Sequence, residues 1–123
     1  MTDYILSIPL RRPPLTSNDQ RRAHWTTVRN AKAEVEYRVR HAAQQARIGT
    51  LSAPQTVTVI WHAPDDRRRD SDSLSPFLKA SLDALVKCGV LEDDCPPHVT
   101  STSMRTVVDR ANPRIEIQLQ EAA

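Results

Sequence analysis

The stretch QTVTVIWHAPDDRRRDSDSLSPFLKASLDALVKCG, residues 55–89, decides the fold. From Gln55 to Trp61 polar and apolar residues alternate, which predicts a strand with one wet face. Ser75 is expected as the N-cap of a helix that has Pro76 at its first position and stops at Gly89. Its buried stripe consists of leucines spaced three or four residues apart: Leu78, Leu82 and Leu85.

Upstream of this stretch the sequence predicts one short strand and one long helix. Asp3 to Ile8 is expected to be a strand that stops at Pro9. The helix is expected to begin at Asn18 or Asp19 and to stop at Gly49. Its apolar stripe, with spacings of three or four, comprises Val28, Ala31, Val35, Val39, Ala42 and Ala46.

Downstream, two further strands complete the expected fold. Val99 to Val108 is expected to be a strand, Asn112-Pro113 a turn, and Arg114 to Leu119 a final alternating strand. The element order is then β-α-β-α-β-β. This order predicts a single α+β domain over residues 1–123, with two helices packed on a four-stranded mixed sheet.

Composition limits the function classes. The chain has 17 Lys plus Arg and 15 Asp plus Glu, but its arginines are bunched, so local charge matters more than the net charge of +2. No stretch approaches the roughly 18 apolar residues of a membrane span, and the N-terminus lacks the pattern of a secretory signal. We therefore expect a soluble, cytoplasmic protein without a membrane partner, in which Cys88 and Cys95 are reduced.

The segment from Arg67 to Leu74 indicates chemistry rather than stability. On an extended backbone Asp70 and Asp72 would project to the same side. Two carboxylates about 4 Å apart repel by roughly 4 kcal/mol at an effective dielectric near 20. A hard divalent ion such as Mg2+ relieves this repulsion, so the pair is a candidate metal site. The competing interpretation is that one aspartate caps the helix that follows.

Between about Leu15 and Val99 the chain resembles the RusA-like Holliday junction resolvases, a family of crossover junction endodeoxyribonucleases. The resemblance is carried by residues in the family's order: Arg68, Arg69, Asp70, Asp72, Leu74, Lys79, Asp83, Ala84, Leu85, Gly89, Asp93 and Asp94. Asn18-Asp19 followed by His24-Trp25 resembles the motif that opens the family's first helix. Ser73 stands where the family usually has Asn, and three extra residues precede Lys79. Three residues are nearly one helical turn, so Lys79 is still expected to reach the same side.

The resemblance implies an enzyme of DNA recombination and repair, in a bacterial cell or a phage-infected host. It implies a homodimer that binds a four-way DNA junction and nicks two opposed strands symmetrically. It also implies Mg2+, with Mn2+ as the alternative ion, bound by three aspartates: Asp70, Asp72 and Asp94. Lys79 would stabilise negative charge on the phosphate, while Asp83 and Asp93 would orient the metal ligands or hold Lys79.

Two groups of basic residues are candidates for DNA contact. Arg67, Arg68 and Arg69 are expected to bind backbone phosphates near the scissile bond. A second group on the long helix would extend the positive surface: Arg22, Arg29 and Lys32. For His24 and Trp25 we favour ordinary helix packing over DNA contact.

Several alternatives remain open. Two alternative functions are a nuclease that cuts other branched DNA and a DNA-binding protein that does not cleave. Lys79 and Asp83 are equally well explained as a surface ion pair, and Asp93-Asp94 alone as a solvated turn. Cys95 and His98 have a spacing seen in zinc sites, but no second pair accompanies them.

Overall fold

Four strands form one mixed sheet in the computed structural model, which describes residues 3–122. The elements are β1 (Tyr4–Ile8), α1 (Ser17–Arg22), α2 (Trp25–Gln45), β2 (Gln55–Ala63), α3 (Ser75–Lys87), β3 (Val99–Val108) and β4 (Arg114–Glu121). The strand order is β1-β4-β2-β3, and β2 pairs antiparallel with β4 but parallel with β3. The predicted α+β class and four-stranded mixed sheet are confirmed, with three helices instead of two.

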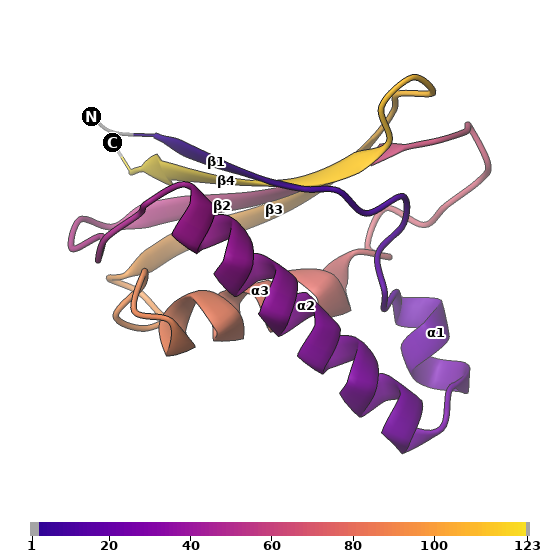
Figure 1. The fold of residues 1–123 in the computed structure, drawn as a ribbon, viewed down its shortest axis with the longest axis horizontal. Coiled ribbons are helices and arrows are strands. Elements are labelled where there is room, and N and C mark those ends of the chain that lie inside the picture. Colours follow the sequence, from indigo (N-terminus) through magenta and orange to yellow (C-terminus); the bar gives the residue numbers. More distant parts are fainter. Residues whose placement is uncertain (1–2, 123) are drawn as a thin grey trace.

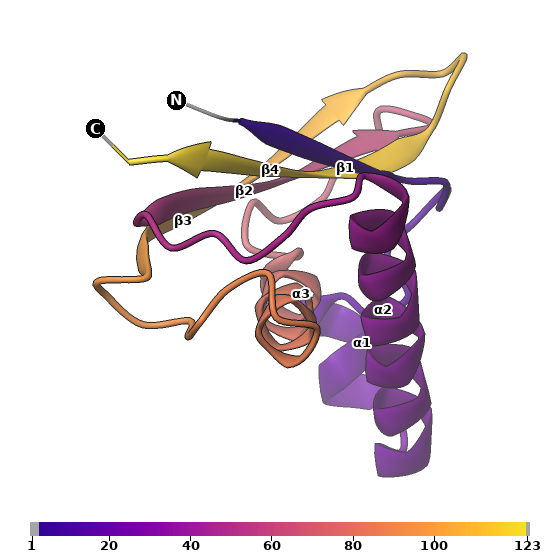
Figure 2. The same cartoon turned by 60° about the vertical axis from the view of Figure 1, so that its left-hand side comes forward.

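Helices α2 and α3 lie side by side on one face of the sheet, and no helix of residues 3–122 covers the opposite face (Figures 1 and 2). The alternation predicted for β2 turns Val57, Val59 and Trp61 into the core. Ile117 and Leu119 on β4 pack beside them, and both are fully buried. Within residues 3–122 each helix is too short or too polar to span a membrane.

The prediction of one long helix from Asn18 or Asp19 to Gly49 was wrong. The chain leaves the helical conformation at Ala23 and His24, which have extended backbones, so α1 and α2 are separate. His24 caps the new helix because its Nδ1 accepts from the Thr26 amide at 3.3 Å. At the other end α2 stops at Gln45, and Arg47 has a positive φ of 55°, before Gly49 is reached.

The buried stripe of α2 is shorter than predicted. Val35 and Val39 are fully buried, and Ala43 completes the buried side of the helix. Ala46 was expected on this stripe but is exposed, because the helix has already ended at the residue before it. The buried residues of α2 therefore lie from its midpoint onward.

The start of α3 also differs from the prediction. Leu74, not Ser75, is the N-cap, and no side chain caps the first turn. The Ser75 hydroxyl instead donates to the backbone carbonyl of Asp72 at 2.8 Å. Pro76 lies in the first turn as expected, Gly89 follows the helix with a φ of 85°, and the predicted leucine stripe is buried.

We expect Phe77→Ala to lower the free energy of unfolding by about 3–5 kcal/mol, because Phe77 is the largest fully buried side chain and its loss leaves a cavity. Urea unfolding followed by circular dichroism measures the change. Val108→Ala, at a residue that is 48% exposed, is the control and should stay within about 0.5 kcal/mol of wild type. Equal losses in the two variants would contradict the assignment of Phe77 to the centre of the core.

Candidate functional site

Asp70 and Asp72 lie in a turn that leads into α3, so the extended backbone assumed for them was wrong. The Ser73 amide donates to the Asp70 carbonyl at 3.1 Å, and the Ser75 amide donates to the Asp72 carbonyl at 3.1 Å. Both carboxylates are exposed, and within residues 3–122 neither accepts a hydrogen bond. Their carbonyls, not their carboxylates, hold the start of the helix, so neither side chain is a cap.

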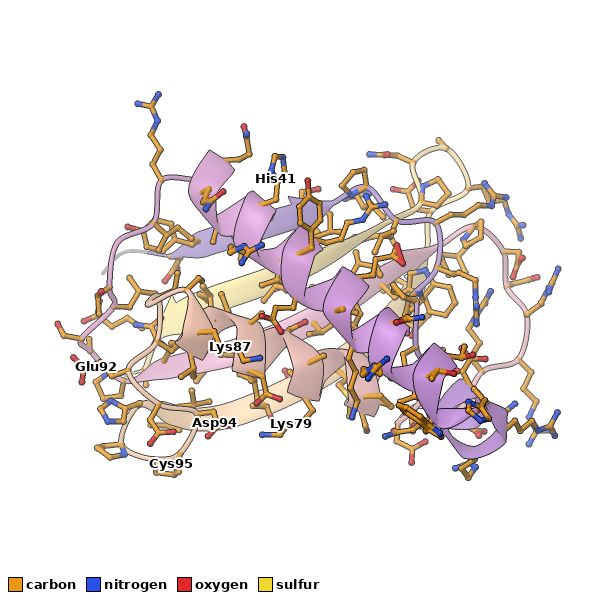
Figure 3. The ribbon with its side chains drawn as sticks, turned by 60° about the horizontal axis from the view of Figure 1, so that its bottom comes forward. His41, Lys79, Lys87, Glu92, Asp94 and Cys95 are labelled. Carbon is orange, nitrogen blue, oxygen red and sulfur yellow. The ribbon has the colours of Figure 1, made fainter. Side chains whose placement is uncertain are left out.

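The ammonium group of Lys79 contacts two of the other predicted acidic residues, one of which, Asp94, is labelled beside it in Figure 3. Its Nζ lies 2.9 Å from Asp94 Oδ2 and 3.1 Å from Asp83 Oδ1. The Asp94 amide donates to Asp93 Oδ1 at 2.7 Å, which shapes the loop after α3. The predicted ion pair with Asp83 is therefore present, and the three extra residues before Lys79 leave it in reach of Asp94.

These contacts shift the pKa values of both partners. The hydrogen bond to Asp94 is the largest cause that raises the pKa of Lys79, and the same bond lowers the pKa of Asp94. The stabilisation from Asp94 is thus present at neutral pH and is lost as the pH falls below about 4, through the lowered pKa. The stabilisation from Lys79 is present at neutral pH and is lost only as the pH rises above about 10, through the raised pKa. Because Lys79 is 65% exposed, solvent screening keeps the contribution small.

The carboxylates of this site suit Mg2+ in kind but not in arrangement. Within residues 3–122, no three side chains of His, Cys, Asp or Glu lie close enough together to hold one metal ion. The three aspartates expected to share the ion, Asp70, Asp72 and Asp94, are therefore not gathered into one group. Asp70 and Asp72 precede α3, whereas Asp94 follows it and is bound by Lys79.

Cys95 and His98 do not form a zinc site with other residues that the structure describes. His98 Nδ1 lies 3.5 Å from Glu92 Oε2, and Cys95 is a free, exposed thiol. Neither belongs to a group of three potential ligands among the described residues. Cys88 is also a free thiol.

An arginine-rich hollow of about 510 Å³ lies beside Asp70. It is walled by the lead-in to α1, by α1 itself, by the end of β2 and by the charged segment. Its lining contains five arginines and one acid: Arg12, Arg21, Arg67, Arg68, Arg69 and Asp70. We call it the arginine hollow. Such a surplus of guanidinium groups favours an anionic ligand, above all phosphate.

The three consecutive arginines have different surroundings. Arg69 is only 17% exposed, with its guanidinium 4.5 Å from the centre of the Trp61 ring and 2.6 Å from Asp65 Oδ1. Arg67 is 81% exposed and pairs loosely with Asp65 at 3.5 Å. Arg68 is exposed and forms no ion pair within residues 3–122. Arg68 is thus the most available of the three to bind phosphate, whereas the guanidinium of Arg69 is already engaged by Trp61 and Asp65.

Sequence reasoning missed Arg12 and Arg21 as residues of this hollow. Both depend on α1, which begins at a capping box formed by Thr16 and Asp19, and Arg12 binds Asp19 at 3.0 Å. Burial raises the pKa of Asp19, but hydrogen bonds from Thr16 and Arg12 outweigh it and lower the pKa overall. The Thr16-x-x-Asp19 spacing was the signal that could have revealed this helix start.

The basic residues of the helical region do not form one stripe. Arg22 ends α1, whereas Arg29 and Lys32 belong to α2. Lys32 lines a second groove, of about 400 Å³, together with Lys79 and Lys87 between α2 and α3.

The expectation that Trp25 takes part in ordinary helix packing was wrong, because its side chain is 63% exposed.

Substitution of Asp94 should lower the pKa of Lys79 more than substitution of Asp83. Asp94 makes the shorter contact, 2.9 Å against 3.1 Å, and is the less exposed carboxylate of the two, and its hydrogen bond is the largest single cause that raises this pKa. A pH titration of the lysine side-chain signals by NMR in Asp94→Asn and Asp83→Asn measures both shifts. A larger fall of the Lys79 pKa in Asp83→Asn would show that the ammonium group interacts more strongly with Asp83 on α3 than with Asp94 in the loop.

Comparisons with known proteins do not identify this chain. No family model matches it, and no curated protein matches its sequence. The resemblance to the RusA-like resolvases is thus carried by the order and spacing of the residues between Leu15 and Val99 alone.

Proposed function

We propose that the protein is an endodeoxyribonuclease that resolves four-way DNA junctions by paired nicks, with Mg2+ as its cofactor. The observation that carries the proposal is the arginine hollow with the exposed carboxylate of Asp70 at its wall. A phosphodiester in this hollow would meet guanidinium groups on several sides. Such contacts position a nucleic acid without reading its sequence, as a structure-selective enzyme requires.

The surroundings of two arginines support a role in phosphate binding. Arg68 and Arg21 form no ion pair among the described residues, so their charge is available to bind phosphate. Lys79 lies on α3 and lines the groove between α2 and α3, not the arginine hollow, so a role in stabilising negative charge on the phosphate is proposed from the resemblance. Mg2+ is proposed from the resemblance, since the carboxylates as arranged give the ion no defined place.

A homodimer is part of the proposal because a four-way junction has two equivalent strands to cut. A two-fold dimer would present the arginine hollow twice, once to each strand. The long edge strand β3 and the open face of the sheet leave surface for such a contact (Figure 2).

A second candidate is a DNA-binding protein on the same fold that does not cleave. It is favoured by the engagement of Asp94 with Lys79, which leaves Asp70 and Asp72 without a third acidic partner. A nuclease for forks or flaps is the remaining alternative, because the hollow does not encode the shape of a junction.

Asp70→Asn should abolish cleavage of a labelled four-way junction while binding persists or tightens, because a negative charge next to the phosphate is removed. Junction, fork and linear duplex are incubated with Mg2+ or with chelator. The matched control is Asp66→Asn, an exposed aspartate of the same loop that does not line the hollow and should cut like wild type. Binding without product on any substrate would favour the second candidate.

Arg68→Gln should weaken junction binding and reduce the slope of log affinity against log salt by about 1, the loss expected for one phosphate contact. The control is Arg38→Gln, at an arginine of α2 outside the hollow that pairs with Glu34 at 3.7 Å. Binding is measured by fluorescence anisotropy over a series of salt concentrations. An unchanged slope in Arg68→Gln would remove the hollow from the DNA interface.

A further inference from the structure

We propose that Trp25 and Arg29, at the start of α2, form a stacking platform for unpaired nucleic-acid bases. We call these two side chains the Trp25 platform. The inference rests on the nucleic-acid binding in the proposed function, not on cleavage. It adds a contact to bases at a place distinct from the arginine hollow, whose lining does not include Trp25 or Arg29.

The exposure of Trp25 sets it apart from the other tryptophan of the chain. Trp61 is 5% exposed in the core, whereas Trp25 is 63% exposed. An indole in water forgoes the burial that makes tryptophan stabilising, so this ring adds little to the fold. A large flat π surface in solvent suits a flat ligand that binds by stacking.

The ring is held in place by its neighbours on α2. The Arg29 guanidinium lies 5.0 Å from the ring centre, and the His24 ring lies 5.6 Å away at a tilt of 34°. His24 is itself anchored, because its Nδ1 is 2.7 Å from Thr26 Oγ1 and accepts from the Thr26 amide. A ring positioned before binding loses less conformational entropy when a base stacks on it.

The surrounding charge favours nucleic acid as the occupant. Residues 20–32 contain four Lys or Arg and no Asp or Glu. A base stacked on Trp25 would carry its phosphates past these cations. This end of α2 lies beside α1 and projects away from the sheet (Figure 1). A nucleic-acid strand can therefore reach it without contacting the sheet. Only unpaired bases expose a face to such a ring, which selects single strands over duplex.

Tyr37 provides the comparison within the same helix. It is 60% exposed and stacks on His41 with ring centres 6.2 Å apart. Unlike Trp25, it follows directly on an acidic residue, Glu36, and it lines a groove against β1. Exposure alone does not make a platform, so Tyr37 is the matched control.

The test is the quenching of tryptophan fluorescence by an oligothymidylate of about 16 nucleotides in the presence of EDTA. The chain has two tryptophans, and the buried Trp61 lines the arginine hollow, so only the quenching that is lost in Trp25→Leu is assigned to Trp25. Wild type should quench strongly. In Trp25→Leu, anisotropy of labelled oligonucleotide should show roughly 5- to 150-fold weaker binding, the usual worth of one stacked base. Trp25→Phe, which keeps an aromatic face, should retain most of the affinity, and Tyr37→Leu all of it.

Three results would overturn the platform. One is unchanged affinity for the single strand in Trp25→Leu, and another is an equal loss of affinity for blunt duplex. The third is a molar mass of Trp25→Leu that differs from that of wild type in light scattering. Such a difference would make the ring a contact between two copies of the chain. If wild type cuts no DNA but binds oligothymidylate through Trp25, the nuclease proposal is contradicted and the Trp25 platform is still supported.

Discussion

The arrangement of the candidate site depends on Trp61, whose ring is buried at the end of β2. Its indole N–H donates to the carbonyl of Arg11 at 3.0 Å, and Arg69 lies over its face at 4.5 Å. A buried N–H without an acceptor would cost about 1–3 kcal/mol, so the lead-in to α1 is drawn to this point. Arg69 in turn holds Asp65 at 2.6 Å, which folds the charged segment back on itself. One aromatic ring thus fixes two walls of the arginine hollow.

Lys79 has a comparable role for the acidic residues. The carboxylates of Asp83 and Asp94 both contact its ammonium group, which ties the loop after α3 to the helix and offsets their repulsion. An ammonium and a divalent cation compete for the same carboxylate and repel each other. In this structure the carboxylate of Asp94 is held by Lys79 and is not gathered with those of Asp70 and Asp72.

Much of the fold followed from local pattern, while the site did not. The period of the apolar residues was enough for β4, which begins at Arg114 as predicted and buries alternate residues, and for the buried leucines of α3. The break at His24 was missed because histidine is not among the usual N-cap residues. Arg12 and Arg21 were missed for another reason: the contact that positions this wall joins residues 50 apart in the sequence. No periodicity reports such a contact.

The six-residue helix α1 links the acidic turn to the arginine hollow. A helix this short is unstable alone, so it must be held by tertiary contacts. The Ser17 amide donates to the Ser73 carbonyl at 3.1 Å, and the Ser17 hydroxyl to the Asp72 carbonyl at 3.1 Å. The backbone of the acidic turn is thereby used to dock α1, and this leaves the aspartate side chains free. Because α1 also carries Arg21, any movement of the turn would shift the acidic groups and the wall of the hollow together.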